Sequence, residues 1–199
     1  MIGRYCRVEP VDLARHGADL EEAYGESPDA RDWTYLAADR VPLTGGGDDP
    51  MHHAIVDAAT GKAVGTAALM RIDPANGVIE VGWVAYSRRL QRTPMATEAM
   101  YLLMRRVFDE LGYRRYEWKC DSLNAPSRAA AERYGFQFEG IFRQAVMYRG
   151  RNRDTAWYSI TDHEWPAIRT AFERWLAPTN FDAAGRQRES LTAMRDAHD

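Results

Sequence analysis

The sequence predicts an α/β fold with a mixed, mostly antiparallel central sheet of about seven strands, flanked by helices. Two observations support this. Three strand-like runs, 51–56, 62–71 and 78–87, follow one another through short turns, as in an antiparallel meander. From Pro94 to Leu111 the apolar residues recur instead at the helical period, and a strand-like run follows over 113–120. A strand joined to the next through a helix lies parallel to it, so one parallel strand–helix–strand unit is expected.

The segment before the meander is expected to hold an edge strand and two helices. Residues 5–11 alternate as a strand, and Asp12 is a plausible N-cap for the helix that follows. Residues 28–42 predict a second, shorter helix, and the glycine-rich run 45–50 predicts a loop. Within the meander, Asn76-Gly77 is a strong hairpin signal.

The segment after the crossover is expected to close the sheet. A short helix ends at Gly135, and 136–148 and 155–161 form a hairpin. The last clear helix has a buried stripe of Trp165, Ile168, Phe172 and Trp175. We therefore predict one domain over residues 1–176, with a polar C-terminal tail over 177–199 that forms a loose helix or is disordered.

Composition excludes several classes of protein. The 199 residues carry 26 basic and 29 acidic side chains, a formal charge of -3, which argues against a dedicated nucleic-acid binder. The two cysteines, Cys6 and Cys120, are far apart, so reduced buried thiols are favoured over a disulfide. No signal-like start and no long apolar run occur. We expect a cytoplasmic protein with no membrane partner.

The start of the long helix is the first candidate binding site. Thr93 is a good N-cap and Pro94 suits the first helical position. The amides of Met95, Ala96 and Thr97 would then point out of the helix, where they could bind phosphate. Three arginines would add positive charge there: Arg88, Arg89 and Arg92. The alternative is an ordinary capped helix with surface arginines.

The second candidate is the pair Asn124 and Ser127, which directly follows the neighbouring strand. Asparagine offers a donor and an acceptor to amide-like ligands, and serine offers one mobile hydroxyl. The alternative is a helix N-cap, a role that both residue types often take.

Taken together and in order, these motifs resemble the GNAT superfamily of acyl-CoA-dependent N-acetyltransferases. The family's phosphate turn matches Gln91-Arg-Thr-Pro-Met-Ala96, which continues as Thr97-Glu98-Ala99. Glu80-Val-Gly-Trp83, the Asn-x-x-Ser motif and Tyr134-Gly-Phe-x-x-Glu-Gly140 are similar to the branch that contains the RimJ/RimL acetyltransferases. The resemblance covers residues 3–176.

The resemblance implies a GNAT fold, acetyl-CoA as co-substrate, no metal, and a primary amine as acceptor. It allows a homodimer. Ser127 would be the acid for the leaving thiolate, with Asn124 as the second catalytic-site residue. Acceptor contacts would come from Trp33, Tyr35 and Glu80, with core packing as the alternative for Trp33 and Tyr35. The implied cofactor contacts are Trp83, Val84, Ala85, Tyr86, Gln91, Arg92, Thr93, Pro94, Met95, Ala96, Thr97, Asn124 and Ser127.

The chain also departs from the family pattern. Pro94 replaces the first glycine of the phosphate turn, which removes one amide donor and stiffens the turn. Ala131 stands where many members have a tyrosine acid, and Val146 follows Arg143-Gln-Ala145 where the branch can carry a glutamate base. The carboxylates nearest by position to such a base are Glu80, Asp121 and Asp154, although for each a solvated or structurally paired role is the alternative.

Without an assigned base, the acceptor is expected to be an amine of low pKa. An α-amine with a pKa near 8 is roughly a tenth neutral at pH 7, whereas lysine is neutral on the order of once in 2,000. The sequence therefore predicts acetyl transfer by direct attack on acetyl-CoA, to a protein N-terminus or a small amine. A non-catalytic acyl-CoA-binding regulatory module is the alternative, and an oligomerisation scaffold is a third.

Overall fold

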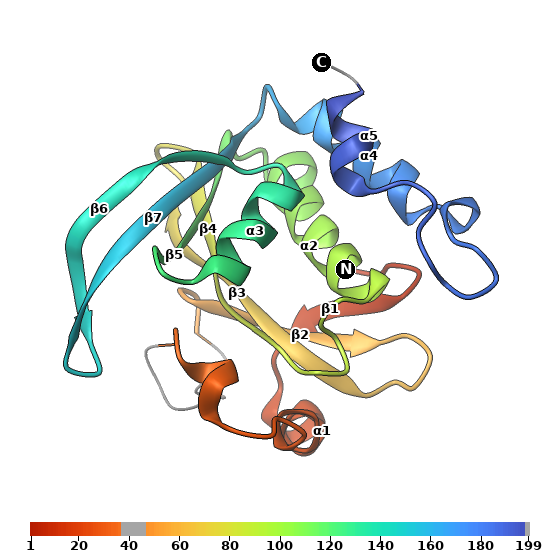
Figure 1. Ribbon diagram of the computed structural model, residues 1–199, viewed down its shortest axis with the longest axis horizontal. Helices are drawn as coiled ribbons and strands as arrows, with labels where there is room; N and C mark the ends of the chain where they lie inside the picture. The colour runs from red at the N-terminus through yellow and green to blue at the C-terminus, as the bar shows by residue number, and fades with distance from the viewer. Residues whose placement is uncertain (37–46, 198–199) are drawn as a thin grey trace.

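The computed structural model describes residues 1–36 and 47–197, and its centre is a seven-stranded sheet of order β1-β2-β3-β4-β5-β7-β6 (Figure 1). The β4–β5 pair is parallel and the other neighbouring pairs are antiparallel. The predicted mixed, mostly antiparallel sheet is thus confirmed. The strands are β1 (Cys6–Pro10), β2 (Met51–Asp57), β3 (Ala63–Asp73), β4 (Val78–Tyr86), β5 (Arg115–Asp121), β6 (Gln137–Tyr148) and β7 (Arg151–Thr161).

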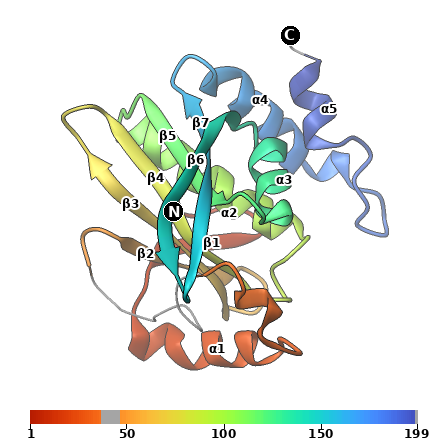
Figure 2. The same ribbon diagram turned by 60° about the vertical axis from the view of Figure 1, so that its left-hand side comes forward.

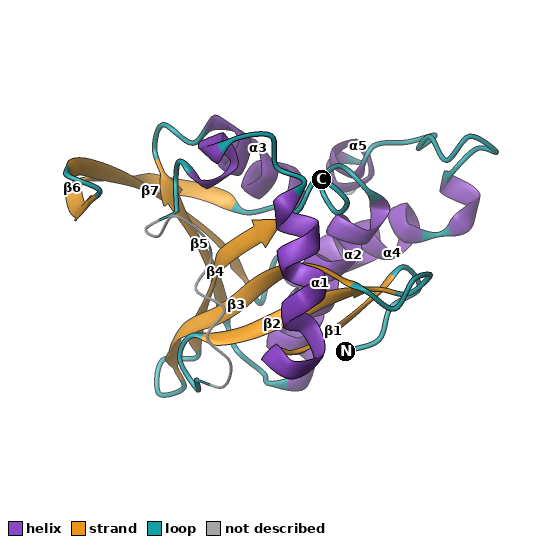
Figure 3. Cartoon of the chain, turned by 90° about the horizontal axis from the view of Figure 1, so that it is seen from below, coloured by secondary structure: helices purple, strands orange, loops and turns teal. Residues whose placement is uncertain are grey.

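Helices cover both faces of the sheet. The crossover helix α2 begins at Pro94 as predicted, and after Arg105 it continues as a π turn to Glu110. Figure 1 shows α1 below the sheet and α2 and α4 above it, so in Figure 3, which is seen from below, α1 lies in front. The helices are α1 (Leu13–Gly25), α2 (Pro94–Arg105), α3 (Ala125–Tyr134), α4 (Trp165–Leu176) and α5 (Leu191–Asp196).

The helix predicted over 28–42 was wrong where the structure describes it. Only a 3₁₀ turn forms, over Ala30–Trp33, because local side-chain bonds compete with a regular helix. Asp29 Oδ1 accepts the Arg31 N–H at 2.9 Å, and the Ser27 hydroxyl donates to the Asp29 carbonyl at 3.0 Å. The rest of the prediction, 37–42, and the start of the predicted loop, 45–46, lie outside the described residues.

Among the described residues, two apolar cores lie on opposite faces of the sheet. The larger joins the sheet to α2, α4 and α5 and includes Met100, Trp118 and Phe172. The smaller lies under α1, where Leu20 and Tyr24 pack against Ala54 and Ala85. The stripe predicted for the last helix is buried in the larger core: Trp165, Ile168, Phe172 and Trp175.

A buried carboxylate fixes α2 to the start of the chain. Glu98 accepts the backbone N–H groups of Arg4, Tyr5 and Cys6 at 2.7, 2.6 and 2.9 Å. These charge-assisted bonds satisfy three donors that the short β1 leaves free, and they hold α2 in register with the sheet. Gly3 packs directly on the Glu98 side chain, where a Cβ atom would come within 2.4 Å of the carboxylate.

The segment after α4 returns to the body of the protein and packs there. Phe181 meets the Trp175 ring edge-on at 5.2 Å, and Leu191 and Met194 of α5 are buried in the larger core. A few apolar residues in a polar stretch are enough for this packing. Within residues 1–36 and 47–197, no helix combines the length and apolar character that a bilayer span requires.

Candidate functional site

The two parallel strands separate part-way along their length and leave an open wedge. β4 pairs with β5 only over Val78–Val81, opposite Arg115–Trp118. Beyond that point β4 keeps only β3 as a partner, and β5 keeps only β7. The facing edges of 82–86 and 119–121 therefore lack a strand partner, and such an edge can pair with an extended ligand.

A bulge in β4 shapes this edge. Trp83 has φ of 47°, and β4 has one more residue than β3 between two paired positions, Gly82 and Ala85. The Ser87 N–H donates to the β3 carbonyl of Val64, so alternation turns the backbone groups of Tyr86 and Val84 toward the wedge. These residues lie within the segment expected to contact the cofactor.

The first turn of α2 offers fewer donors than the sequence predicts. Thr93 Oγ1 accepts the Ala96 N–H at 3.2 Å and donates to the Leu90 carbonyl at 2.7 Å. Because this bond occupies the Ala96 amide, the expectation that it is free was wrong. Pro94 has no N–H, so Met95 provides the free amide of this turn among the described residues. Gln91 Nε2 donates to the Tyr86 carbonyl at 2.7 Å and so ties the turn to the end of β4.

Two of the three arginines expected around this turn are already paired. Arg88 forms a two-bond ion pair with Asp32, and Arg89 bonds Glu22 on α1 and Glu26 at its C-cap. Arg92 is exposed at the turn, with φ of 60°.

Sequence reasoning missed a different cation near the same turn. Arg133, on α3, donates to Thr97 Oγ1 at 3.0 Å. No local motif marks this residue, because α3 brings it to α2 from 36 positions away.

Asn124 and Ser127 both lie at the start of α3. Asn124 caps the helix through Oδ1, which accepts the Ser127 N–H at 3.1 Å. The Ser127 hydroxyl is half-buried and accepts a bond from Trp118 Nε1 at 3.0 Å. Trp118 is the last residue of β5 that pairs with β4, so Ser127 lies at the point where the wedge opens. Burial raises the pKa of the neighbouring Cys120 thiol, and a hydrogen bond from Ser127 opposes that shift.

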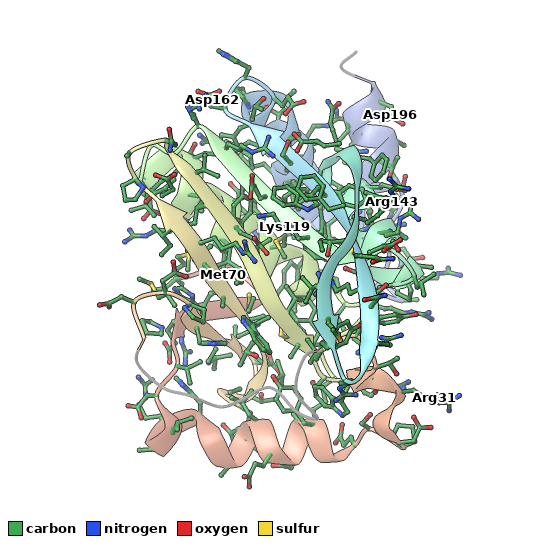
Figure 4. The ribbon with its side chains drawn as sticks, turned by 90° about the vertical axis from the view of Figure 1, so that its left-hand side faces the viewer. Arg31, Met70, Lys119, Arg143, Asp162 and Asp196 are labelled. Carbon is green, nitrogen blue, oxygen red and sulfur yellow. The ribbon has the colours of Figure 1, made fainter. Side chains whose placement is uncertain are left out.

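The face of the sheet on the α1 side carries a row of buried charged side chains. Val81 and Trp118 point into the larger core, so alternation directs Glu80, Glu117 and Lys119 to the α1 side. Figure 4 shows Lys119 over the centre of the sheet, while α1 lies at the bottom of the view. Its Nζ lies 2.9 Å from Glu80 Oε2, 2.7 Å from Glu117 Oε2 and 3.8 Å from the centre of the Trp157 ring. Burial raises the pKa of Glu80, although Lys119 opposes the shift.

The expected acceptor residues are not equivalent in the structure. Trp33 is 8% exposed and meets Tyr24 edge-on at 5.1 Å in the smaller core. Tyr35 is half-buried, and its hydroxyl donates to the Leu123 carbonyl at 2.9 Å, next to Asn124. The structure thus places Tyr35, but not Trp33, beside the loop that leads to Ser127.

The other two candidate bases hold structural positions. Asp121 is 3% exposed and accepts the Tyr148 hydroxyl at 2.8 Å and the Leu123 N–H at 2.9 Å. Asp154 Oδ1 accepts the Gln144 N–H at 2.7 Å within the bulge of β6, in the hairpin that crosses the front of Figure 2. Both carboxylates therefore have the structurally paired role that was the alternative to acting as a base.

Comparison with known proteins now places this fold. The family description "Acetyltransferase (GNAT) domain" matches residues 12–137, more than half of the chain. The chain belongs to the GNAT acetyltransferase family. The matched residues include the wedge strands β4 and β5, the capped helix α2 and the Asn-x-x-Ser motif.

Solved GNAT structures have a similar overall fold. A GCN5-related N-acetyltransferase from Brucella melitensis is 49% identical with a TM-score of 0.95, over 98% of this chain and 93% of that one. A probable GNAT acetyltransferase from Chromobacterium violaceum ATCC 12472 is 39% identical with a TM-score of 0.76, over 83% and 87%. A Bacillus subtilis (strain 168) protein, provisionally named ribosomal N-acetyltransferase YdaF, is 31% identical over 53% of this chain and 57% of its own length. The chain thus spans little more than half of that curated relative.

Proposed function

We propose that the protein transfers an acetyl group from acetyl-CoA to a primary amine, with the co-substrate in the wedge between β4 and β5. One observation supports this most directly. The strands part after Val81 and Trp118, and each then has an edge without a strand partner. The chain that carries these edges is a member of the GNAT family. The wedge offers free backbone groups for an amide-bearing arm, and the first turn of α2 offers a positive helix end for phosphates.

The residues present fit acetyl-CoA. The backbone groups of Val84 and the Tyr86 N–H would pair with the pantetheine arm as an added strand does, since the Tyr86 carbonyl already accepts Gln91 Nε2. The Met95 amide and Arg92 would hold the diphosphate. Asn124 would fix the first turn of α3, and so the position of Ser127. Glu80 and Tyr35 would contact the acceptor.

The reaction needs no covalent enzyme intermediate. The lone pair of a neutral amine attacks the thioester carbonyl carbon and forms the C–N bond. The tetrahedral intermediate then expels sulfur, which keeps the electron pair of the broken C–S bond. The sulfur accepts a hydrogen bond and a proton from Ser127, and the amine loses its proton to water or to a nearby base.

We propose an α-amine, as in the RimJ/RimL branch, as the preferred acceptor. Asp121 and Asp154 are paired, and Glu80 is held by Lys119, so a strong base is not apparent among these three candidates. An α-amine needs little help because roughly a tenth of it is neutral at pH 7. The name of YdaF, a ribosomal N-acetyltransferase, supports a protein acceptor and does not separate an α-amine from a lysine.

Release of free thiol from acetyl-CoA tests the proposal. The amines would be a peptide with a free N-terminus, an N-blocked peptide with one lysine, and an aminoglycoside. We expect the free N-terminus to react fastest, and Ser127→Ala to lower kcat by about 10²-fold or more while CoA affinity is kept. Ser122→Ala, in the same loop, is the matched control and should keep full activity.

The other outcomes are also decisive. Thermal stabilisation by CoA without thiol release on any amine would favour a regulatory acyl-CoA-binding module. Absence of any CoA stabilisation would contradict both the enzyme and the module.

A further inference from the structure

The Ser127 hydroxyl has two neighbours among the described residues, the indole of Trp118 and the Cys120 thiol. Trp118 Nε1 lies 3.0 Å from Ser127 Oγ. An indole nitrogen can only donate, so Oγ must be the acceptor of this bond. The hydroxyl proton therefore cannot point at Trp118. It bonds the Cys120 sulfur here and can rotate to another sulfur acceptor.

The indole cannot easily turn away from this position. Trp118 is 5% exposed, and its ring meets Phe136 edge-on at 5.6 Å and lies 6.2 Å from Tyr134. Ser127 is held from the other side, since Asn124 caps its backbone N–H. Donor and acceptor thus belong to two rigid elements, β5 and α3, and the bond is preorganised rather than formed on binding.

The placement of this bond matters for the leaving group. Trp118 is the last residue of β5 to pair with β4, so the bond lies where the wedge opens. As sulfur takes the electron pair of the C–S bond, Ser127 gives its proton toward that sulfur and Oγ gains negative charge. A fixed N–H aimed at Oγ stabilises that charge, and Oγ later regains a proton from water.

We infer that Trp118 is a positioning residue for acetyl transfer, whose N–H orients the Ser127 hydroxyl toward the departing thiolate and stabilises charge on Oγ. This inference rests on the proposed function. It differs from a packing role, since any buried aromatic ring would fill the same space without the N–H.

Trp118→Phe keeps an aromatic ring and removes the donor. We expect kcat to fall about 10- to 100-fold, as when one fixed donor to a developing anion is lost, with the KM for acetyl-CoA changed less than about twofold. The acceptor is the fastest amine of the panel above. Trp165→Phe is the matched control, because Trp165 is also buried and its Nε1 bonds Asp109 Oδ1 at 2.6 Å, away from the wedge. Its kcat should stay within about twofold of wild type.

A double-mutant cycle separates positioning from packing. If Trp118 acts through Ser127, Trp118→Phe should change kcat less than about twofold in a Ser127→Ala background. An equal fall in both backgrounds, or an unchanged kcat in the single variant, would overturn the inference. Should Trp118→Phe not fold, a benzothiophene analogue of tryptophan at position 118 keeps the ring shape without the N–H, and the same criteria apply.

The cycle also distinguishes this inference from the proposed function. If Ser127→Ala keeps full kcat, the role proposed for Ser127 fails, and the inference fails with it. If Ser127→Ala is inactive while Trp118→Phe is fully active, the proposed function stands and this inference alone is wrong.

Discussion

Replacing Pro94 with alanine should strengthen binding of CoA. Pro94 is the first residue of α2, where an ordinary residue would direct an N–H out of the helix. Thr93 already caps the Ala96 amide, so the first turn has one free amide, that of Met95, among the described residues. Alanine restores a second donor at the positive end of the helix without the backbone freedom of glycine.

The size of the effect follows from the kind of bond restored. A hydrogen bond to a charged group contributes about 1.5–3 kcal/mol net. Pro94 lies at a half-exposed turn, where solvent screens the charge, so we take the lower end. That corresponds to roughly tenfold tighter binding of CoA. The same change should lower the free energy of unfolding by about 0.4–1 kcal/mol, because proline no longer restricts the unfolded chain.

Isothermal titration of CoA into both proteins at one ionic strength measures this prediction. Pantetheine, which lacks the diphosphate, should bind the two proteins equally. Pro166→Ala, in the first turn of α4, is the matched control and should leave CoA binding unchanged. Equal CoA affinity for wild type and Pro94→Ala would refute the reasoning, and so would an equal gain for pantetheine.

Two further predictions concern titratable side chains that are buried in the sheet. Lys119→Met leaves Glu80 and Glu117 without their shared cation, so urea denaturation should show a loss of about 3 kcal/mol, partly regained on adding Glu80→Gln. A loss below about 1 kcal/mol would contradict the pairing. Burial lowers the pKa of His53 to about 4. The unfolded state then binds more protons between pH 6.5 and 4, so His53 costs up to about 3 kcal/mol of stability as the pH falls through that window. Denaturation across this range should show a smaller loss for His53→Gln than for wild type, and parallel curves would contradict the shift.

Local patterns in the sequence were sufficient for most elements of the fold. The start of α2 was predicted because Thr93 and Pro94 suit a helix start wherever it occurs. The hairpin at Asn76-Gly77 and the stripe of α4 were equally local, since each depends on residues close together in the chain. The prediction failed over 28–36, where Asp29 and Ser27 bond to the nearby backbone and limit the helix to one 3₁₀ turn.

The sequence by itself determined that the chain is an α/β protein of the GNAT type, with a capped crossover helix and an Asn-x-x-Ser helix start. Only the tertiary structure decided which groups remain available there. Arg88 and Arg89 are paired with acidic residues, Arg133 reaches α2 from α3, and Trp118 donates to Ser127. Helix starts and turns depend on neighbours in sequence, whereas the pairing of a charge or a hydroxyl depends on side chains brought from distant elements.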